Sequence, residues 1–187
     1  MSITTSITTS PHVHPTVRRA LLVALGIGCA ATLSACGDDA GAAADGVVEV
    51  TMADFHYGDL PDEVEAGTRL VIENTSATEL HELVAFRLAD DDDRSVDEIM
   101  AGDLEGLLGG TPPATVLLAG PGGEQIAAVG DGTLDVPGRY LLLCAIPTGA
   151  DPEEYLAAAA ASDGPPQVDG GPPHFVHGMV DELIVTR

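Results

Sequence analysis

The stretch that decides the fold is VPGRYLLLC, residues 136–144, in which a Pro-Gly turn leads into an apolar run that ends at a cysteine. Such a run predicts a buried central strand. The chain then returns through His174 and His177 to Met179, and its last apolar residues, 183–185, predict a closing strand. Thiolate, imidazole and thioether groups are the donors that copper electron-transfer sites combine. The sequence therefore points to a metal site where the central strand meets this final loop.

A further imidazole is expected from His81. Residues 80–88 predict a strand in which His81, Leu83 and Ala85 share one face, so His81 would stand on the core side. Each candidate alone has a simpler interpretation. A lone Cys144 can be a small buried apolar residue, and His81 can be a buried histidine with satisfied hydrogen bonds. The combination of these residues with the later histidines and Met179 favours a metal site.

Short strand signals separated by turns run through residues 47–187. Glycine, proline and asparagine interrupt apolar or alternating runs at short intervals, and helix signals are few. This pattern is typical of an all-β sandwich. Besides the segments above, strands are expected at 47–52, 69–74, 116–119, 125–129 and 133–136.

Two helices are expected between these strands. Ser95, with Glu98 three residues later, has the capping-box pattern of a helix N-terminus. Apolar residues at helical spacing over residues 96–108 predict one helix, which the glycines at 109–110 would end. An alanine-rich stretch predicts a second, short helix at 151–161.

The first 36 residues have the organisation of an export signal. Arg18 and Arg19 precede an apolar run, residues 20–33, which closes with two small residues before Cys36. The run is shorter than the roughly 18 to 20 apolar residues that a membrane span needs. The sequence LSAC, residues 33–36, resembles the lipobox of bacterial lipoproteins.

This resemblance implies cleavage before Cys36 and lipidation of its thiol. We therefore expect a lipoprotein signal peptide at 1–35, a flexible Gly/Ala/Asp tether at 36–46 and one folded domain at 47–187. The protein is expected at the cell membrane, anchored by lipid and facing the extracytoplasmic side. Export by the general secretory or the twin-arginine route stays open.

The chain is strongly acidic. It has 7 Arg and Lys residues against 30 Asp and Glu residues, a formal net charge of −23. Loss of Arg18 and Arg19 with the leader would leave 5 − 30 = −25. Such a charge excludes nucleic acid as a partner and disfavours docking of the protein surface on anionic lipid. It favours a protein partner with a basic patch, although a salt-rich source would explain the same composition.

Three segments together resemble the cupredoxins, the copper-protein fold of plastocyanin. Asn74, a short turn and His81 resemble the first ligand strand of that family. The segment from residue 137 to Cys144 resembles its Gly-x-Tyr-x-x-x-Cys strand. The run from His174 to Met179, followed by a closing strand, resembles the segment that carries its second histidine and axial methionine.

The resemblance implies a cupredoxin-like Greek-key β-sandwich with short helical insertions and copper as the cofactor. The implied metal ligands are His81, Cys144, His174 and Met179, with His177 as the alternative to His174. Spacing to Met179 favours His174. The interval from Cys144 to His174, 174 − 144 = 30 positions, is longer than is usual in the family, which predicts a looser coupling of these two ligands.

The implied function is that of a membrane-tethered type 1 copper protein that carries one electron at a time, and we expect a monomer. The partner would be a redox or copper-handling protein. A copper-binding or delivery lipoprotein is the first alternative, which the long interval favours, and a metal-free interaction module is the second. An enzyme is not expected, because the chain has no Gly-x-Ser-x-Gly, His-Glu-x-x-His or phosphate-binding loop.

Overall fold

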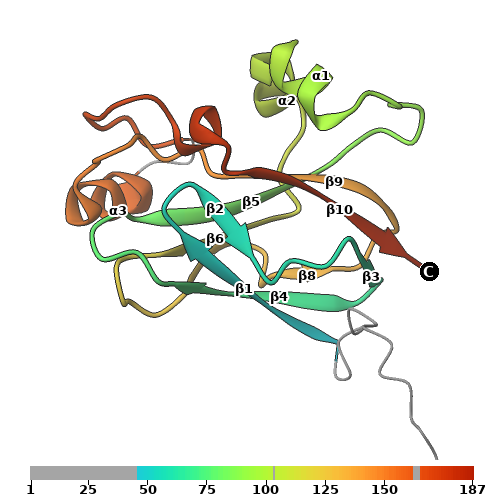
Figure 1. Ribbon diagram of the computed structural model, residues 1–187, viewed down its shortest axis with the longest axis horizontal. Helices are drawn as coiled ribbons and strands as arrows, with labels where there is room; N and C mark the ends of the chain where they lie inside the picture. Colours follow the sequence, from blue (N-terminus) through green and yellow to red (C-terminus); the bar gives the residue numbers. More distant parts are fainter. Residues whose placement is uncertain (1–45, 103, 162–164) are drawn as a thin grey trace, which may run out of the picture. The chain divides into compact units, whose positions relative to one another are not determined.

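The structure is a computed structural model that describes residues 46–102, 104–161 and 165–187 (Figure 1). The predicted signal peptide at 1–35, the lipidated Cys36 and almost all of the predicted tether at 36–46 lie outside the described residues. None of the described helices has the length and apolar character needed to cross a membrane.

The first sheet has four strands in the order β2-β1-β4-β8. Its two long strands, β1 and β4, run parallel, with Val50 opposite Ile72. Buried and more exposed residues alternate along both strands, because one face of the sheet packs on the core. The strands are β1 (Val47–Ala53), β2 (His56–Gly58), β4 (Thr68–Asn74) and β8 (Thr133–Leu134).

The second sheet has six strands in the order β3-β10-β9-β5-β6-β7. Strand β9 lies between β10 and β5 and pairs antiparallel with both, which confirms the predicted central strand. The closing strand is β10. The strands are β3 (Glu63–Glu65), β5 (His81–Arg87), β6 (Thr115–Ala119), β7 (Ile126–Val129), β9 (Gly138–Leu143) and β10 (Val180–Thr186).

Strands β5 and β9 are buried on both faces. Leu83, Ala85 and Leu142 face the core between the sheets, as the alternation predicted for β5. Val84 and Leu141 belong to a second apolar cluster on the other side, under helices α1 and α2. Figure 1 shows these two helices on the side of the second sheet that faces away from the first. Burial on both faces explains why the run before Cys144 is almost entirely apolar.

The predicted all-β sandwich with short helical insertions is confirmed, with one correction. The helix expected over 96–108 is two helices, because the chain leaves the helical conformation at Gly102. Ser95 and Glu98 form the predicted capping box at its start. The helices are α1 (Val96–Ala101), α2 (Leu104–Gly110), α3 (Pro152–Ala161) and a 3₁₀ helix, η1 (His174–His177).

Asn74 joins the two sheets beside the start of β5. Its Nδ2 donates to the carbonyl of Ala119 at 2.7 Å and to that of Glu79 at 2.9 Å, and its Oδ1 accepts from the N–H of Ser76 at 2.9 Å. Ala119 is the cross-strand partner of His81. The amide therefore fixes both the turn before His81 and the strand next to it.

We predict that Asn74→Ala lowers the free energy of unfolding by about 2–4 kcal/mol, because buried backbone groups lose their partner. Denaturant unfolding measures this loss. Glu73→Ala is the matched control, since Glu73 is exposed and next in the chain, and it should change stability by no more than about 0.5 kcal/mol. Equal losses in the two variants would show that Asn74 does not join the sheets.

Candidate metal centre

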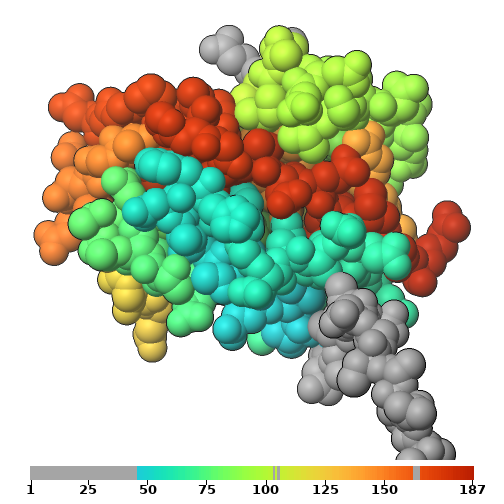
Figure 2. Space-filling model, in the orientation of Figure 1, coloured from blue at the N-terminus to red at the C-terminus, as the bar shows by residue number. Residues whose placement is uncertain are grey.

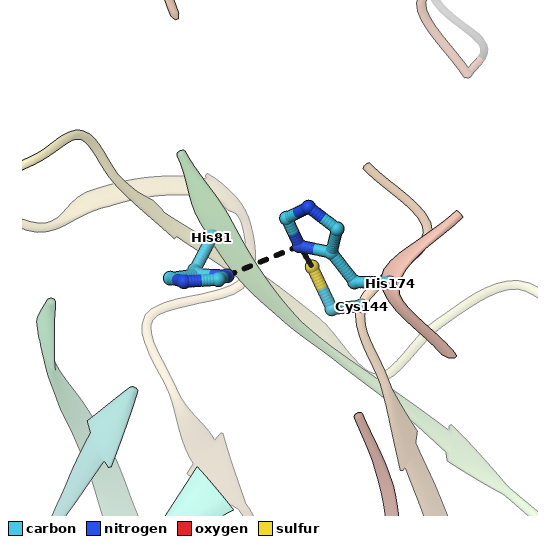
Figure 3. A group of neighbouring side chains, drawn as sticks. All are labelled: His81, Cys144 and His174. Carbon is cyan, nitrogen blue, oxygen red and sulfur yellow. Dashed lines mark hydrogen bonds between the residues drawn. The ribbon is translucent and has the colours of Figure 1, made fainter. Parts of the chain in front are cut away.

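Three predicted ligands converge at one end of the second sheet. His81 opens β5, Cys144 directly follows β9, and His174 opens η1 (Figure 3). All three residues are fully buried, and one donor atom from each lies within 4.8 Å of the other two. Within the described part of the chain they form the only such group of histidine, cysteine and acidic residues.

The donor atoms are arranged as an ion would require. Nδ1 of His81 lies 3.1 Å from Nδ1 of His174, which lies 3.3 Å from Sγ of Cys144. Metal bonds of about 2.0 Å to nitrogen and 2.3 Å to sulfur would place trigonal donors about 3.5 Å apart. Small outward movements would therefore admit an ion. One thiol and two imidazoles are the equatorial donor set of copper electron-transfer sites, so these residues fit copper.

Backbone hydrogen bonds hold the ligand residues to one another. The N–H of Cys144 donates to the carbonyl of Met179 at 3.1 Å, and the carbonyl of Cys144 accepts from Phe175 at 2.9 Å. The N–H of Met179 in turn bonds the carbonyl of His174 at 3.2 Å. Strand β9 and the final loop thus form one connected unit.

The long interval between Cys144 and His174 is closed at its base. The N–H of His174 bonds the carbonyl of Ile146 at 3.0 Å, and that of Thr148 bonds the carbonyl of Pro172 at 3.1 Å. The N–H of Gly171 returns a bond to Thr148 at 2.8 Å. The looser coupling expected from the interval's length is therefore not found, because the two ends are paired next to the ligands.

Burial decides the protonation of the three donors. It lowers the pKa of His81 to about 4, and the neighbouring His174 adds to this effect. It also lowers the pKa of His174 and raises that of the Cys144 thiol far above its usual range. Both imidazoles are thus neutral at physiological pH and can bind a cation. A metal would displace the thiol proton.

Glu82 is a buried carboxyl group that sequence reasoning missed. Its backbone N–H donates to Sγ of Cys144 at 3.4 Å, and its Oε1 accepts from the N–H of Ala145 at 2.9 Å. The hydroxyl of Tyr155, from α3, donates to Oε2 at 3.4 Å. Burial raises the pKa of Glu82 to about 7. The alternation along residues 80–88 put Glu82 on the face opposite to His81, so it gave no signal for this burial.

The outer nitrogens of the two imidazoles face carboxylates. Nε2 of His174 lies 3.3 Å from Oε2 of Glu79, and Nε2 of His81 lies 3.8 Å from Oδ1 of Asp54. Both nitrogens are buried and lack a hydrogen-bond partner with suitable geometry in the described residues. Sequence reasoning missed these acids too, since they lie in turns and no local pattern connects them to the histidines.

The remaining predicted residues lie around this group. Met179 is fully buried, with its backbone bonded to the ligand residues as described. His177 is exposed and outside the group, and its ring lies 4.7 Å from that of Phe55. The Phe55 ring also contacts His174 edge-on at 5.1 Å. Phe55 has a left-handed backbone, with φ of 62°, which is unfavourable for a bulky residue.

The chain matches no family model and no curated protein. Among solved structures it is similar to a Na-dithionite reduced auracyanin from Roseiflexus castenholzii, with 20% identity, a TM-score of 0.44 and coverage of 79% of this chain and 100% of that one. Auracyanin B has 18% identity to this chain and a TM-score of 0.37, with coverage of 75% of this chain and 88% of that one. Auracyanin A, a "blue" copper protein from Chloroflexus aurantiacus, has 16% identity and a TM-score of 0.39, with coverage of 75% of this chain and 98% of that one.

We predict that Gly170→Ala weakens the paired base of the interval. A Cβ at this position would lie 2.5 Å from Cβ of Pro147 and 3.2 Å from the carbonyl oxygen of Thr148, so the backbone must shift. The expected loss is about 1–3 kcal/mol in the free energy of unfolding, measured with denaturant. Gly120→Ala is the control, because its Cβ would meet no atom within 4 Å. Equal stability of the two variants would contradict the tight base.

Proposed function

We propose that this protein is a type 1 copper protein that carries single electrons. The observation that supports this most is the convergence of Nδ1 of His81, Nδ1 of His174 and Sγ of Cys144 in a fully buried position. Copper bound there would supply reversible one-electron chemistry between its two oxidation states. We propose Met179 as the weak axial ligand that tunes the potential.

The residues around the site contribute rigidity. The N–H of Glu82 points to the sulfur of Cys144, and paired backbone groups fix the positions of Cys144 and His174. Donors that are held in one arrangement rearrange little when the charge at the centre changes. The free energy of such rearrangement adds to the barrier for electron transfer, so a fixed donor set supports a carrier.

The burial of the site favours a carrier over copper delivery. Delivery needs the receiving protein's ligands to reach the ion, whereas His81, Cys144 and His174 are 0% exposed. Electron transfer does not need the partner to touch the ion, because an electron can pass through the residues that cover the site. The contacts of Phe55 with both His174 and exposed His177 connect the site to the surface. Figure 2 shows the C-terminal segment (red) bordering the N-terminal strands (cyan) on the visible face. A basic patch on a redox partner would complement the acidic chain.

We predict intense visible absorption from the copper-loaded protein, because a thiolate bound to Cu(II) gives a charge-transfer band. Cys144→Ser should abolish it. His174→Gly should remove or strongly alter the band, while His177→Gly should leave it unchanged, since His177 lies outside the donor group. Absorption spectra at matched copper content test this. A colourless wild type, or equal effects of the two histidine variants, would contradict the proposed site.

We also propose that lipid on Cys36 tethers the protein to the outer face of the cell membrane. The support is the arginine pair, the apolar run and the lipobox-like residues 33–36. Cys36→Ser should move the protein from the membrane fraction to the soluble fraction and abolish labelling by a fatty acid. Cys29→Ser is the control, because Cys29 would be removed with the leader. Membrane association that survives Cys36→Ser would rule out this anchor.

A further inference from the structure

Both candidate imidazole ligands are oriented in the same way. Each turns Nδ1 toward the group of donors and Nε2 away from it, toward an acidic side chain. His174 faces Glu79, and His81 faces Asp54. The two acids come from different turns, one before β5 and the other between β1 and β2. The same pairing therefore arises twice from unrelated parts of the chain.

Metal binding would fix the protons of these rings. A neutral imidazole has one N–H and one lone pair, so an ion on Nδ1 leaves the proton on Nε2. Nε2 is buried in both residues and has no well-formed hydrogen bond in the part of the chain that the structure describes. The carboxylates of Glu79 and Asp54, at 3.3 and 3.8 Å, are the acceptors in place for that proton.

We propose that Glu79 and Asp54 are positioning residues that make this site favour a divalent over a monovalent metal ion. The inference rests on the metal site of the proposed function. A carboxylate that accepts the outer N–H makes the imidazole a stronger donor, and its negative charge stabilises the ion in proportion to the ion's charge. For copper, the same preference would stabilise the oxidised form relative to the reduced form and so lower the reduction potential.

Glu79 and Asp54 should differ in how strongly they affect the bound ion. The side chain of Glu79 is only 16% exposed, and its Oε2 also accepts from the N–H of Gly149 at 3.0 Å, so its position is fixed. The side chain of Asp54 is 58% exposed and lies farther from its histidine. Water and salt screen an exposed charge. Glu79 is therefore the main contributor and Asp54 the lesser one.

The test compares Zn(II) with Ag(I), ions that carry these charges without redox chemistry. Dissociation constants for both ions are measured by competition in the wild type, Glu79→Gln and Asp54→Asn. Gln keeps an oxygen for the N–H of Gly149 and removes only the charge. Glu65→Gln is the matched control: Glu65 is exposed and pairs with Thr186, at the end of β10 away from the site. Unfolding midpoints confirm that each variant is folded.

Glu79→Gln should lower the preference for Zn(II) over Ag(I) about tenfold and Asp54→Asn by less, within the range for partners of metal-bound histidines. Glu65→Gln should leave it unchanged. In the copper protein, a tenfold shift equals a rise in potential of about 59 mV. A change in Glu79→Gln no larger than in Glu65→Gln would overturn the inference. A wild type that binds neither ion would overturn both the inference and the proposed site.

The test also separates this inference from the proposed electron transfer. If the variants change the Zn(II) to Ag(I) preference as expected, but copper in the wild type does not cycle reversibly between its oxidation states, the electron-carrier function fails. The assignment of Glu79 and Asp54 would then still hold. If copper cycles reversibly and the ion preference does not change, the function stands and the roles of the two acids fail.

Discussion

The candidate centre depends on the complete burial of the ends of β5 and β9. One face of this strand pair packs on the first sheet and the other on α1 and α2, and at the ends that carry the ligands His81, Cys144 and His174 are fully buried. Each buried polar group without a partner costs about 1–3 kcal/mol. Nδ1 of His174 lies 3.1 Å from Nδ1 of His81 and 3.3 Å from Sγ of Cys144, and the Nε2 atoms of both histidines have no well-formed hydrogen bond among the described residues. An ion would give the three converging donor atoms a common partner, which is why burial and metal binding belong together here.

Much of the fold can be predicted from the sequence because the strands follow local rules. The run that ends at Cys144 is apolar because β9 is covered on both faces, and alternation along residues 80–88 correctly placed His81 on the core side. The capping box of Ser95 and Glu98 was predictable for the same reason, since both partners lie within one helical turn. The break at Gly102 was not, because apolar spacing continues across it.

The surroundings of the site could not be predicted in this way. Glu79 lies beside His174, Asp54 beside His81 and Glu82 beside Cys144. Each pair is far apart in the sequence, and only strand pairing and the packing of loops and sheets bring its members together. The pairing of Thr148 with Pro172 is also non-local, and it turns a long interval into a short structural connection. Residue types and order were thus enough to identify candidate ligands, whereas the charges and bonds around them required the three-dimensional arrangement.

The left-handed backbone of Phe55 carries an energetic cost that the contacts of its ring must offset. At a φ of 62° an aromatic residue is held against its intrinsic preference, at a cost of about 1–2 kcal/mol, and glycine would adopt the same turn without strain. Glycine would, however, leave the edge of His174 uncovered. The contacts of the ring with His174 and His177 therefore offset the strain of the turn that carries it.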